Sequence, residues 1–274
     1  MAAEPQPDAG SRRLVAVGRA LGRVPRRAVT RLTGRPPAPG HVRLGDLRRP
    51  APISRHYGMD RGLPVDRYYV EDFLRRHGGS SGYGGGDIHG HVLEVGGDDY
   101  ARQFGGWSGE GAGHPESAIT ALDVLHADAS NPVATIVGDL ATGAAIPEDR
   151  FDCVICTQTL HVIYEVEAAI ATLQRMLKPG GVALVTIPGI TQTCRPDRDL
   201  WGDYWRFTTL SARRLFETAF APEDVRVEAY GNVLASIAFL EGLAAAELRR
   251  EELEPRDPDY EMLITVRAQR GLGG

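Results

Sequence analysis

In HVLEVGGDDY, residues 91–100, a short apolar run at 91–95 is followed by two glycines. Apolar runs of this length are typical of strands buried on both faces, and the glycines predict a tight turn after the strand. Six more such runs follow, at residues 119–122, 134–137, 151–156, 182–187, 225–229 and 262–268. Segments with helical periodicity lie before and between the runs, at residues 66–77, 167–177, 211–220 and 232–252. This alternation predicts an α/β fold, with a doubly wound and mostly parallel sheet covered by helices on both faces.

The first 52 residues differ in composition from the rest and predict a flexible basic arm. Residues 1–55 contain twelve Arg and three acidic residues, whereas the whole chain has a net charge of −5. Residues 34–52 are rich in Pro and Gly, as linkers are, so the folded body is expected to begin near Ile53 and to extend over 53–274. Residues 11–33 space apolar groups helically between arginines. Three interpretations stay open for them: a tail without a role, a helix on anionic lipid or a partner protein, or a targeting peptide.

Length and composition exclude several classes of protein. The chain has 274 residues, 42% of them hydrophobic, which is enough for a large core, and its three Cys are too few for a disulfide scaffold. No apolar stretch approaches the roughly 18 residues of a membrane span. A basic arm on an acidic body is not the charge pattern of a nucleic-acid-binding domain. Cys153 and Cys156 are expected on opposite faces of one strand, so they do not predict a metal site. We therefore expect a cytoplasmic protein that binds neither nucleic acid nor metal.

The residues at the ends of the predicted strands are the candidates for a ligand site, because ligands of open parallel sheets bind there. Glu94 and Gly96 belong to the first strand and its turn, where glycine lets a ligand approach the backbone. Asp123 follows the second run, and a carboxylate there can accept two hydrogen bonds from a ribose diol. Asp139 and Leu140 follow the third run, where an acidic and an apolar side chain suit an adenine ring.

Each of these acidic residues also has a purely structural interpretation. Asp123 can cap a following helix, Asp139 can stabilise a turn, and Glu94 can form an ion pair with a nearby Lys or Arg. The residues alone leave both possibilities open.

The motifs, taken in order, resemble those of the class I S-adenosylmethionine-dependent methyltransferases over about residues 87–190. The likeness rests on the glycine turn at 94–98, on the acidic residues at 123 and 139, on Phe151-Asp152, and above all on LKPGG at 177–181. Residues 54–74, 202–208 and 230–248 resemble a bacterial subgroup associated with glycan or secondary-metabolite pathways. The resemblance implies a Rossmann-like seven-stranded sheet whose last strand is antiparallel, and S-adenosylmethionine as the cofactor. The 232–252 pattern adds a C-terminal helical insertion.

The resemblance also implies a role for each candidate. Glu94 and Gly96 would lie by the methionine part of the cofactor, and Asp123 would bind its ribose. Asp139 and Leu140 would contact the adenine, and Gln158 would lie near the sulfonium and the acceptor.

The sequence departs from the family pattern in the glycine turn. Asp98 and Tyr100 stand where the family usually has further glycines, and a bulky residue there can narrow the turn. This departure keeps a second hypothesis open, a non-catalytic domain that retains the fold and docks a partner enzyme. A nicotinamide-dependent oxidoreductase is a weaker rival, because residues 94–100 lack a full G-x-G-x-x-G.

His161, after the fourth strand, is the candidate catalytic residue. An imidazole can accept a proton near neutral pH, although a histidine at that place can also be a partly buried polar group. The expected acceptor is a small molecule or sugar, preferably methylated at oxygen, and the oligomeric state is left open.

Two groups of side chains are candidates for contact with the acceptor. The first precedes the core and would form a lid, the alternative being a solvated arginine face; it consists of Tyr57, Arg61, Arg67 and Tyr68. The second, Tyr204 and Arg206, follows the fifth strand, where the alternative is a hydrophobic plug over the sheet.

Overall fold

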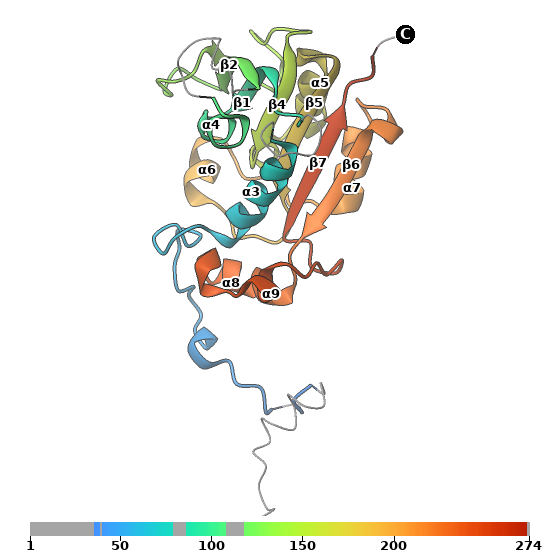
Figure 1. Ribbon diagram of the computed structural model, residues 1–274. Helices are drawn as coiled ribbons and strands as arrows, with labels where there is room; N and C mark the ends of the chain where they lie inside the picture. Colours follow the sequence, from blue (N-terminus) through green and yellow to red (C-terminus); the bar gives the residue numbers. More distant parts are fainter. Residues whose placement is uncertain (1–35, 39, 79–85, 108–117, 273–274) are drawn as a thin grey trace, which may run out of the picture. The chain divides into compact units, whose positions relative to one another are not determined.

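The computed structural model describes residues 36–38, 40–78, 86–107 and 118–272 (Figure 1). The chain divides into two compact units, Met1–Pro50 and Ala51–Gly274. In the first unit the described residues contain one short 3₁₀ helix, η1 (Gly45–Leu47). The amphipathic segment 11–33 lies outside the described residues.

A seven-stranded sheet forms the centre of the second unit, in the order β3-β2-β1-β4-β5-β7-β6. Its strands are β1 (Gly90–Val95), β2 (Ile119–His126), β3 (Ile136–Val137), β4 (Phe151–Thr157), β5 (Leu177–Pro188), β6 (Val225–Tyr230) and β7 (Leu263–Gln269). The first five strands pair in parallel, and β7 runs antiparallel to both of its neighbours, β5 and β6. The predicted α/β fold with an antiparallel last strand is therefore confirmed.

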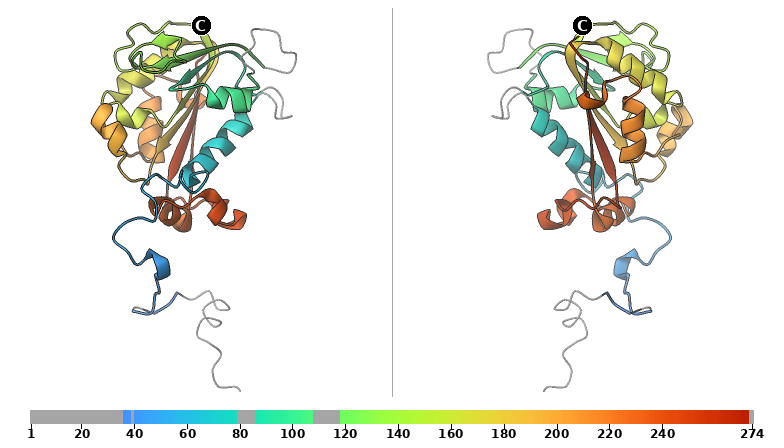
Figure 2. Two further views of the ribbon diagram at one scale, coloured as in Figure 1. Left: turned by 90° about the vertical axis from the view of Figure 1, so that its left-hand side faces the viewer. Right: turned by 90° about the vertical axis from the view of Figure 1, so that its right-hand side faces the viewer.

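Helices cover both faces of the sheet, as the two side views show (Figure 2). One face carries α3 (Val65–His77) and α4 (Asp99–Gly105), and the other carries α5 (Val166–Met176) and α7 (Thr209–Phe216). Helices α8 (Val233–Leu240) and α9 (Arg250–Leu253) lie beyond the end of the sheet, and their buried apolar residues belong to the same cluster as those of α3 (Figure 1). The remaining short helices are α6 (Arg195–Leu200), η2 (Leu160–Val162), η3 (Pro222–Asp224) and η4 (Ala245–Glu247). Each face has its own buried apolar cluster, because alternate strand residues point to opposite sides.

The two cysteines of β4 illustrate this alternation. Cys153 packs in the cluster under α3 and Cys156 in the cluster under α5, so their predicted opposite orientation is confirmed. Burial raises the pKa of both thiols. The described part of the chain contains no group of three His, Cys, Asp or Glu side chains arranged to hold a metal ion. Within the same residues, no helix is both long and apolar enough to cross a bilayer.

Some element boundaries differ from the sequence prediction. The second strand continues past residue 122 to His126, and the fifth begins at Leu177 rather than at 182. The helix expected over 232–252 is instead three short helices, α8, η4 and α9. Gly242 separates the first two with φ of +73°, and a side chain at this position would overlap the backbone of Ser54. Helices α4 and α6 were not predicted.

Candidate functional site

A cavity of about 500 Å³ lies at the carboxyl ends of the first four strands. This is the edge at which open α/β sheets bind ligands, and the volume is in the range of small-molecule sites. The residues that line it come from the ends of β1 to β3, from the segment after β4, and from the segment after α6. They are Val95, Gly96, Leu125, His126, Ala127, Gly138, Asp139, Leu140, Ala141, Thr159, Val162, Ile163, Tyr164, Glu165, Trp201 and Tyr204.

Gly96 brings the backbone itself into the cavity wall. Its φ is +94°, a conformation that favours glycine, and a Cβ built on it meets no described atom within 4 Å. A side chain at Gly96 would therefore project into open space beside the cavity. The structure thus leaves enough space for a ligand to approach the backbone of this turn, as the sequence predicts.

Glu94 has a different position from the one expected of a ligand contact. Its side chain is 4% exposed, and its carboxylate accepts hydrogen bonds from the backbone N–H groups of Tyr100 (3.2 Å) and Ala101 (2.7 Å). Burial raises the pKa of Glu94 to about 7, although these two bonds oppose the shift. Glu94 thus fixes the turn to the first residues of α4, and it does not line the cavity.

The two departures from the glycine pattern also lie away from the cavity. The ring of Tyr100 is stacked on Phe104, with centroids 6.1 Å apart, and packs beside the α3-side core. Asp98 pairs with Arg102 at 2.6 Å. Neither residue lines the cavity, so the substitutions in the turn do not fill it.

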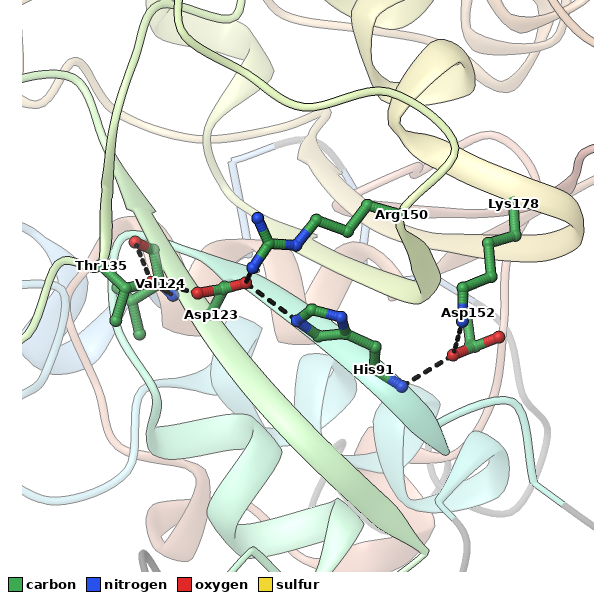
Figure 3. A network of polar contacts seen from close by, with 7 residues as sticks. All are labelled: His91, Asp123, Val124, Thr135, Arg150, Asp152 and Lys178. Carbon is green, nitrogen blue, oxygen red and sulfur yellow. Dashed lines mark hydrogen bonds and ion pairs between the residues drawn. The ribbon is translucent and has the colours of Figure 1, made fainter. Parts of the chain in front are cut away.

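Asp123 lies in the middle of β2 and not after its last residue, which corrects its predicted place at the end of the strand. Its Oδ1 accepts a hydrogen bond from Thr135 at 2.6 Å, and its Oδ2 lies 2.9 Å from both His91 Nε2 and Arg150 Nη2 (Figure 3). The backbone N–H of His91 in turn donates to Asp152, 2.7 Å away. The charge of Asp123 is therefore satisfied within the sheet, and its side chain does not line the cavity.

His126 and Ala127 occupy the position at the end of β2 that the sequence prediction gave to Asp123. Nδ1 of His126 lies 2.9 Å from the carbonyl oxygen of Asp128 and 3.3 Å from the backbone nitrogen of the same residue, so the ring is held beside the chain that follows β2. The Trp201 ring lies nearly perpendicular to the imidazole, with centroids 5.9 Å apart. The sequence prediction missed His126 because it ended the strand at the charged residue.

Asp139 and Leu140 line the cavity after β3, as the sequence pattern led us to expect of two ligand-facing residues. Oδ1 of Asp139 also accepts the N–H of Ala141 at 2.8 Å, so the carboxylate stabilises its own turn. Leu140 is 5% exposed and belongs to the α5-side core. Asp139 can therefore line the cavity and stabilise its own turn at the same time.

Gln158 and His161 follow β4 but do not line the cavity. Gln158 has φ of +48°, and its backbone N–H donates to the carbonyl oxygen of Thr186 at 2.8 Å. The His161 side chain is 7% exposed, and its Nδ1 has no hydrogen-bond partner among the described residues. Burial lowers the pKa of His161, partly opposed by the charge of Asp203, so the ring is neutral at pH 7.

The four predicted lid residues all have partners outside the cavity. Arg61 pairs with Glu247, and Arg67 pairs with Asp66 at 2.7 Å. The ring of Tyr57 packs on Phe239, with centroids 5.9 Å apart, and burial raises its pKa. The ring of Tyr68 meets Tyr69 edge-on at 5.3 Å. None of the four lines the cavity.

The two predicted contacts after β5 separate in the structure. Tyr204 lines the cavity and is 52% exposed, next to Tyr164, another lining residue that the sequence did not suggest. Arg206 does not line it, because both of its terminal nitrogens bind Asp203, at 2.5 and 2.9 Å. The predicted role of Arg206 in direct acceptor contact is therefore not supported by its position.

The lining has a one-sided charge. Asp139 and Glu165 contribute carboxylates, and no described residue that lines the cavity is Lys or Arg. Three aromatic side chains, those of Tyr164, Trp201 and Tyr204, complete the rim. Carboxylates and aromatic faces both attract cations, so the cavity suits a ligand that is neutral or positively charged.

Comparison with known proteins agrees with the architecture. Residues 114–185 match a protein-family model described as a methyltransferase domain. This segment contains β2 to β4, α5 and most of β5, which includes most of the cavity lining. No curated protein sequence matches the chain significantly.

Several solved structures resemble the chain weakly. A phosphoethanolamine N-methyltransferase 2 from Haemonchus contortus, in complex with S-adenosylmethionine, has a TM-score of 0.46 at 13% identity, covering 74% of this chain and 53% of that one. The N-methyltransferase NodS from Bradyrhizobium japonicum, in complex with S-adenosylhomocysteine, has a TM-score of 0.45 at 13% identity and covers 77% and 89%. A complex between the Trm112 methyltransferase activator from Haloferax volcanii and a methyltransferase has a TM-score of 0.45 at 16% identity. The match covers 78% of this chain and 94% of that one.

The match to the family model and the strand order of the sheet indicate the same fold. The strand order, with an antiparallel β7 inserted between β5 and β6, is the Rossmann-like methyltransferase fold. The cofactor of such a domain is S-adenosylmethionine. Together they support an S-adenosylmethionine-dependent methyltransferase domain in this chain.

Proposed function

We propose that the domain formed by residues 53–274 binds S-adenosylmethionine in the cavity and transfers its methyl group to a small molecule or sugar, at oxygen. The observation that carries the proposal is the meeting of Gly96, Asp139 and Leu140 in one cavity at the carboxyl edge of the sheet. The open space beside Gly96 admits a ligand to the backbone. Leu140 supplies an apolar contact for a nucleobase, and the carboxylates and aromatic rim suit a sulfonium cation.

The roles of this chain's residues follow from their surroundings. When bound, S-adenosylmethionine supplies an electrophilic methyl group on a positively charged sulfur. Gly96, His126, Asp139 and Leu140 would hold the nucleoside portion, with His126 in the place first given to Asp123. His161 does not line the cavity itself, but its neighbours Thr159 and Val162 do, so its imidazole lies directly behind the wall. A neutral imidazole with an unpartnered Nδ1 can accept the proton of an acceptor hydroxyl that reaches between these two residues, and we assign this role to His161.

The presence of this buried base favours oxygen over other atoms as the acceptor of the methyl group. Transfer to a hydroxyl requires that a proton leaves, whereas positioning supplies much of the rate for any acceptor. The exposed rings of Tyr164 and Tyr204 at the cavity rim offer faces on which a sugar or an aromatic small molecule can stack. We propose a place in glycan or secondary-metabolite biosynthesis in the cytoplasm, which the identity of the neighbouring genes would test.

Isothermal titration with S-adenosylmethionine and S-adenosylhomocysteine tests the binding proposal. We expect both nucleosides to release or absorb heat with micromolar affinity. We expect the Gly96→Ala variant, which projects a methyl group into the open space, to weaken the signal, and the strain of a side chain at φ of +94° to lower the melting temperature without unfolding the domain at 25 °C. Absence of heat in the wild-type chain at millimolar nucleoside would overturn the proposal.

The second hypothesis, a non-catalytic domain that docks a partner enzyme, was motivated by Asp98 and Tyr100. Both side chains lie outside the cavity, so this motive is weakened. Nucleoside binding without transfer to any hydroxyl acceptor, together with a stable complex with another protein, would favour it.

A further inference from the structure

The segment between β5 and α7 is tied to the segment after β4 by a connected set of hydrogen bonds. The backbone N–H groups of Tyr204 and Trp205 both donate to the carbonyl oxygen of His161, at 2.9 and 3.2 Å. The indole N–H of Trp205 donates to the carbonyl oxygen of Ile163 at 3.1 Å. Residues 203–206 therefore rest directly on the turn that carries His161.

One ion pair closes this segment into a compact loop. The Asp203 side chain is fully buried, and its carboxylate accepts the backbone N–H of Cys194 at 3.0 Å as well as both terminal nitrogens of Arg206. Arg206 also donates to the carbonyl oxygens of Gln192 (2.9 Å) and Trp205 (2.8 Å). A planar guanidinium with several fixed donors is suited to hold a carboxylate and two carbonyls at once.

The loop places two of its side chains in the cavity wall. Trp201 meets His126 near the end of β2, and Tyr204 meets Tyr164 on the side of β4. Both aromatic residues lie within the span that the Asp203–Arg206 pair closes, since its contacts reach from Gln192 to Arg206. The same pair thus fixes the wall on one side and the His161 turn on the other.

We infer that Asp203 and Arg206 are a positioning pair that holds the acceptor side of the cavity, with neither residue touching the cofactor or the acceptor. This inference rests on the proposed function for the identity of the cavity's occupant, but the tie between the loop and the His161 turn does not depend on it. The pair replaces the direct acceptor contact that the sequence suggested for Arg206.

Hydrogen exchange of the full-length protein without ligand tests the pair directly. In Asp203→Asn the Cys194 amide should exchange roughly tenfold faster or more, because its hydrogen bond loses a charged acceptor. The Tyr204 and Trp205 amides donate to the carbonyl oxygen of His161 and should also exchange faster, because the loop that holds them opens more often without the pair. Arg206→Lys keeps the charge but loses the fork and should give a smaller increase. The matched control is Asp199→Asn, since Asp199 pairs with Arg198 on the exposed part of the same segment. An unchanged exchange rate at Tyr204 and Trp205 in Asp203→Asn, or an equal increase in the control, would overturn the inference.

Nucleoside binding provides the second measurement, with S-adenosylhomocysteine as the probe. Its Kd in Asp203→Asn should stay within roughly threefold of the wild type, because the residues at the ends of β1 to β3 are unaffected and Trp201 keeps its own backbone hydrogen bond to Asp197, at 2.7 Å. The NMR titration of His161, assigned with a His161→Gln variant, should shift in Asp203→Asn and stay unchanged in the control. Loss of nucleoside binding in Asp203→Asn with an unshifted His161 titration would assign the pair to the nucleoside site and overturn the inference. If the wild-type chain fails to bind the nucleoside, the proposed function fails while the exchange experiment still decides on the pair.

Discussion

The imidazole Nε2 of His91 lies 2.9 Å from the Oδ2 of Asp123, across the parallel pair β1 and β2. Arg150 reaches the same oxygen from the chain that precedes β4, and Thr135 binds the other oxygen from the chain before β3. The carboxylate thus connects four segments of the sheet region. This explains how an acidic residue can sit in the middle of a strand whose neighbours are apolar.

The first prediction concerns this network. Asp123→Asn should lower the free energy of unfolding by about 1–3 kcal/mol, because His91 and Arg150 lose their shared partner. The affinity for S-adenosylhomocysteine should stay within about twofold of the wild type, because Asp123 is outside the cavity. Urea unfolding and isothermal titration check the two parts. A large loss of affinity in a folded variant would restore the ribose role to Asp123.

The second prediction concerns the turn after β1. Gly96→Ala should reduce nucleoside affinity roughly tenfold, because the added carbon enters the space beside the cavity and strains a residue with φ of +94°. Gly97→Ala is the matched control: its Cβ also meets open space, but Gly97 has no such φ and does not line the cavity. Equal losses in both variants would show that the turn as a whole, and not the backbone of Gly96, sets the affinity.

The third prediction uses the raised pKa of Glu94. Because burial raises the pKa in the folded protein to about 7, the folded state binds the proton more tightly than the unfolded chain does. The protonated Glu94 side chain therefore makes its full contribution to the free energy of unfolding below about pH 4.5. This contribution is lost as the pH rises through 7, and the total loss is roughly 3 kcal/mol.

Chemical unfolding at a series of pH values measures this dependence. Glu94→Gln cannot ionise and should remove that part of the slope between pH 4.5 and 7. An identical pH profile in the variant and the wild type would contradict the assignment to Glu94.

The fourth prediction concerns the aromatic wall. Trp201→Ala should weaken nucleoside binding about three- to tenfold, because an aromatic contact next to His126 is lost, and Trp201→Phe should retain most of the affinity. Leu200→Ala is the control, since Leu200 is 73% exposed and does not line the cavity. Equal affinity of Trp201→Ala and wild type would show that the ring does not reach the bound nucleoside.

Much of the fold could be predicted from the sequence because strands buried on both faces have to be apolar throughout. All seven runs lie within or next to strands, and the turn after β1 is where the two glycines indicated it. The end of β2 was predicted wrongly because the partners of Asp123 are distant in sequence. Likewise, no local pattern shows that Gly242 packs against Ser54, so the single long helix over 232–252 was wrong.

The site was predictable only where a residue contributes through its place at the end of a strand. Gly96, Asp139 and Leu140 line the cavity for this reason. Arg206 satisfied every local criterion for a ligand contact, yet its guanidinium is bound by Asp203, a pairing that only the folded loop shows. His126, Tyr164 and Trp201 carry no motif of their own and became visible only through the shape of the cavity.

The absence of Lys and Arg among the described lining residues affects which of the cell's abundant nucleotides can compete for this space. ATP, NADPH and coenzyme A share an adenosine moiety but carry several phosphate charges. Asp139 and Glu165 would repel those phosphates, and no cationic lining residue would offset the repulsion. If the cavity holds an adenine nucleoside as proposed, its lining would therefore favour a nucleoside without phosphates over these nucleotides.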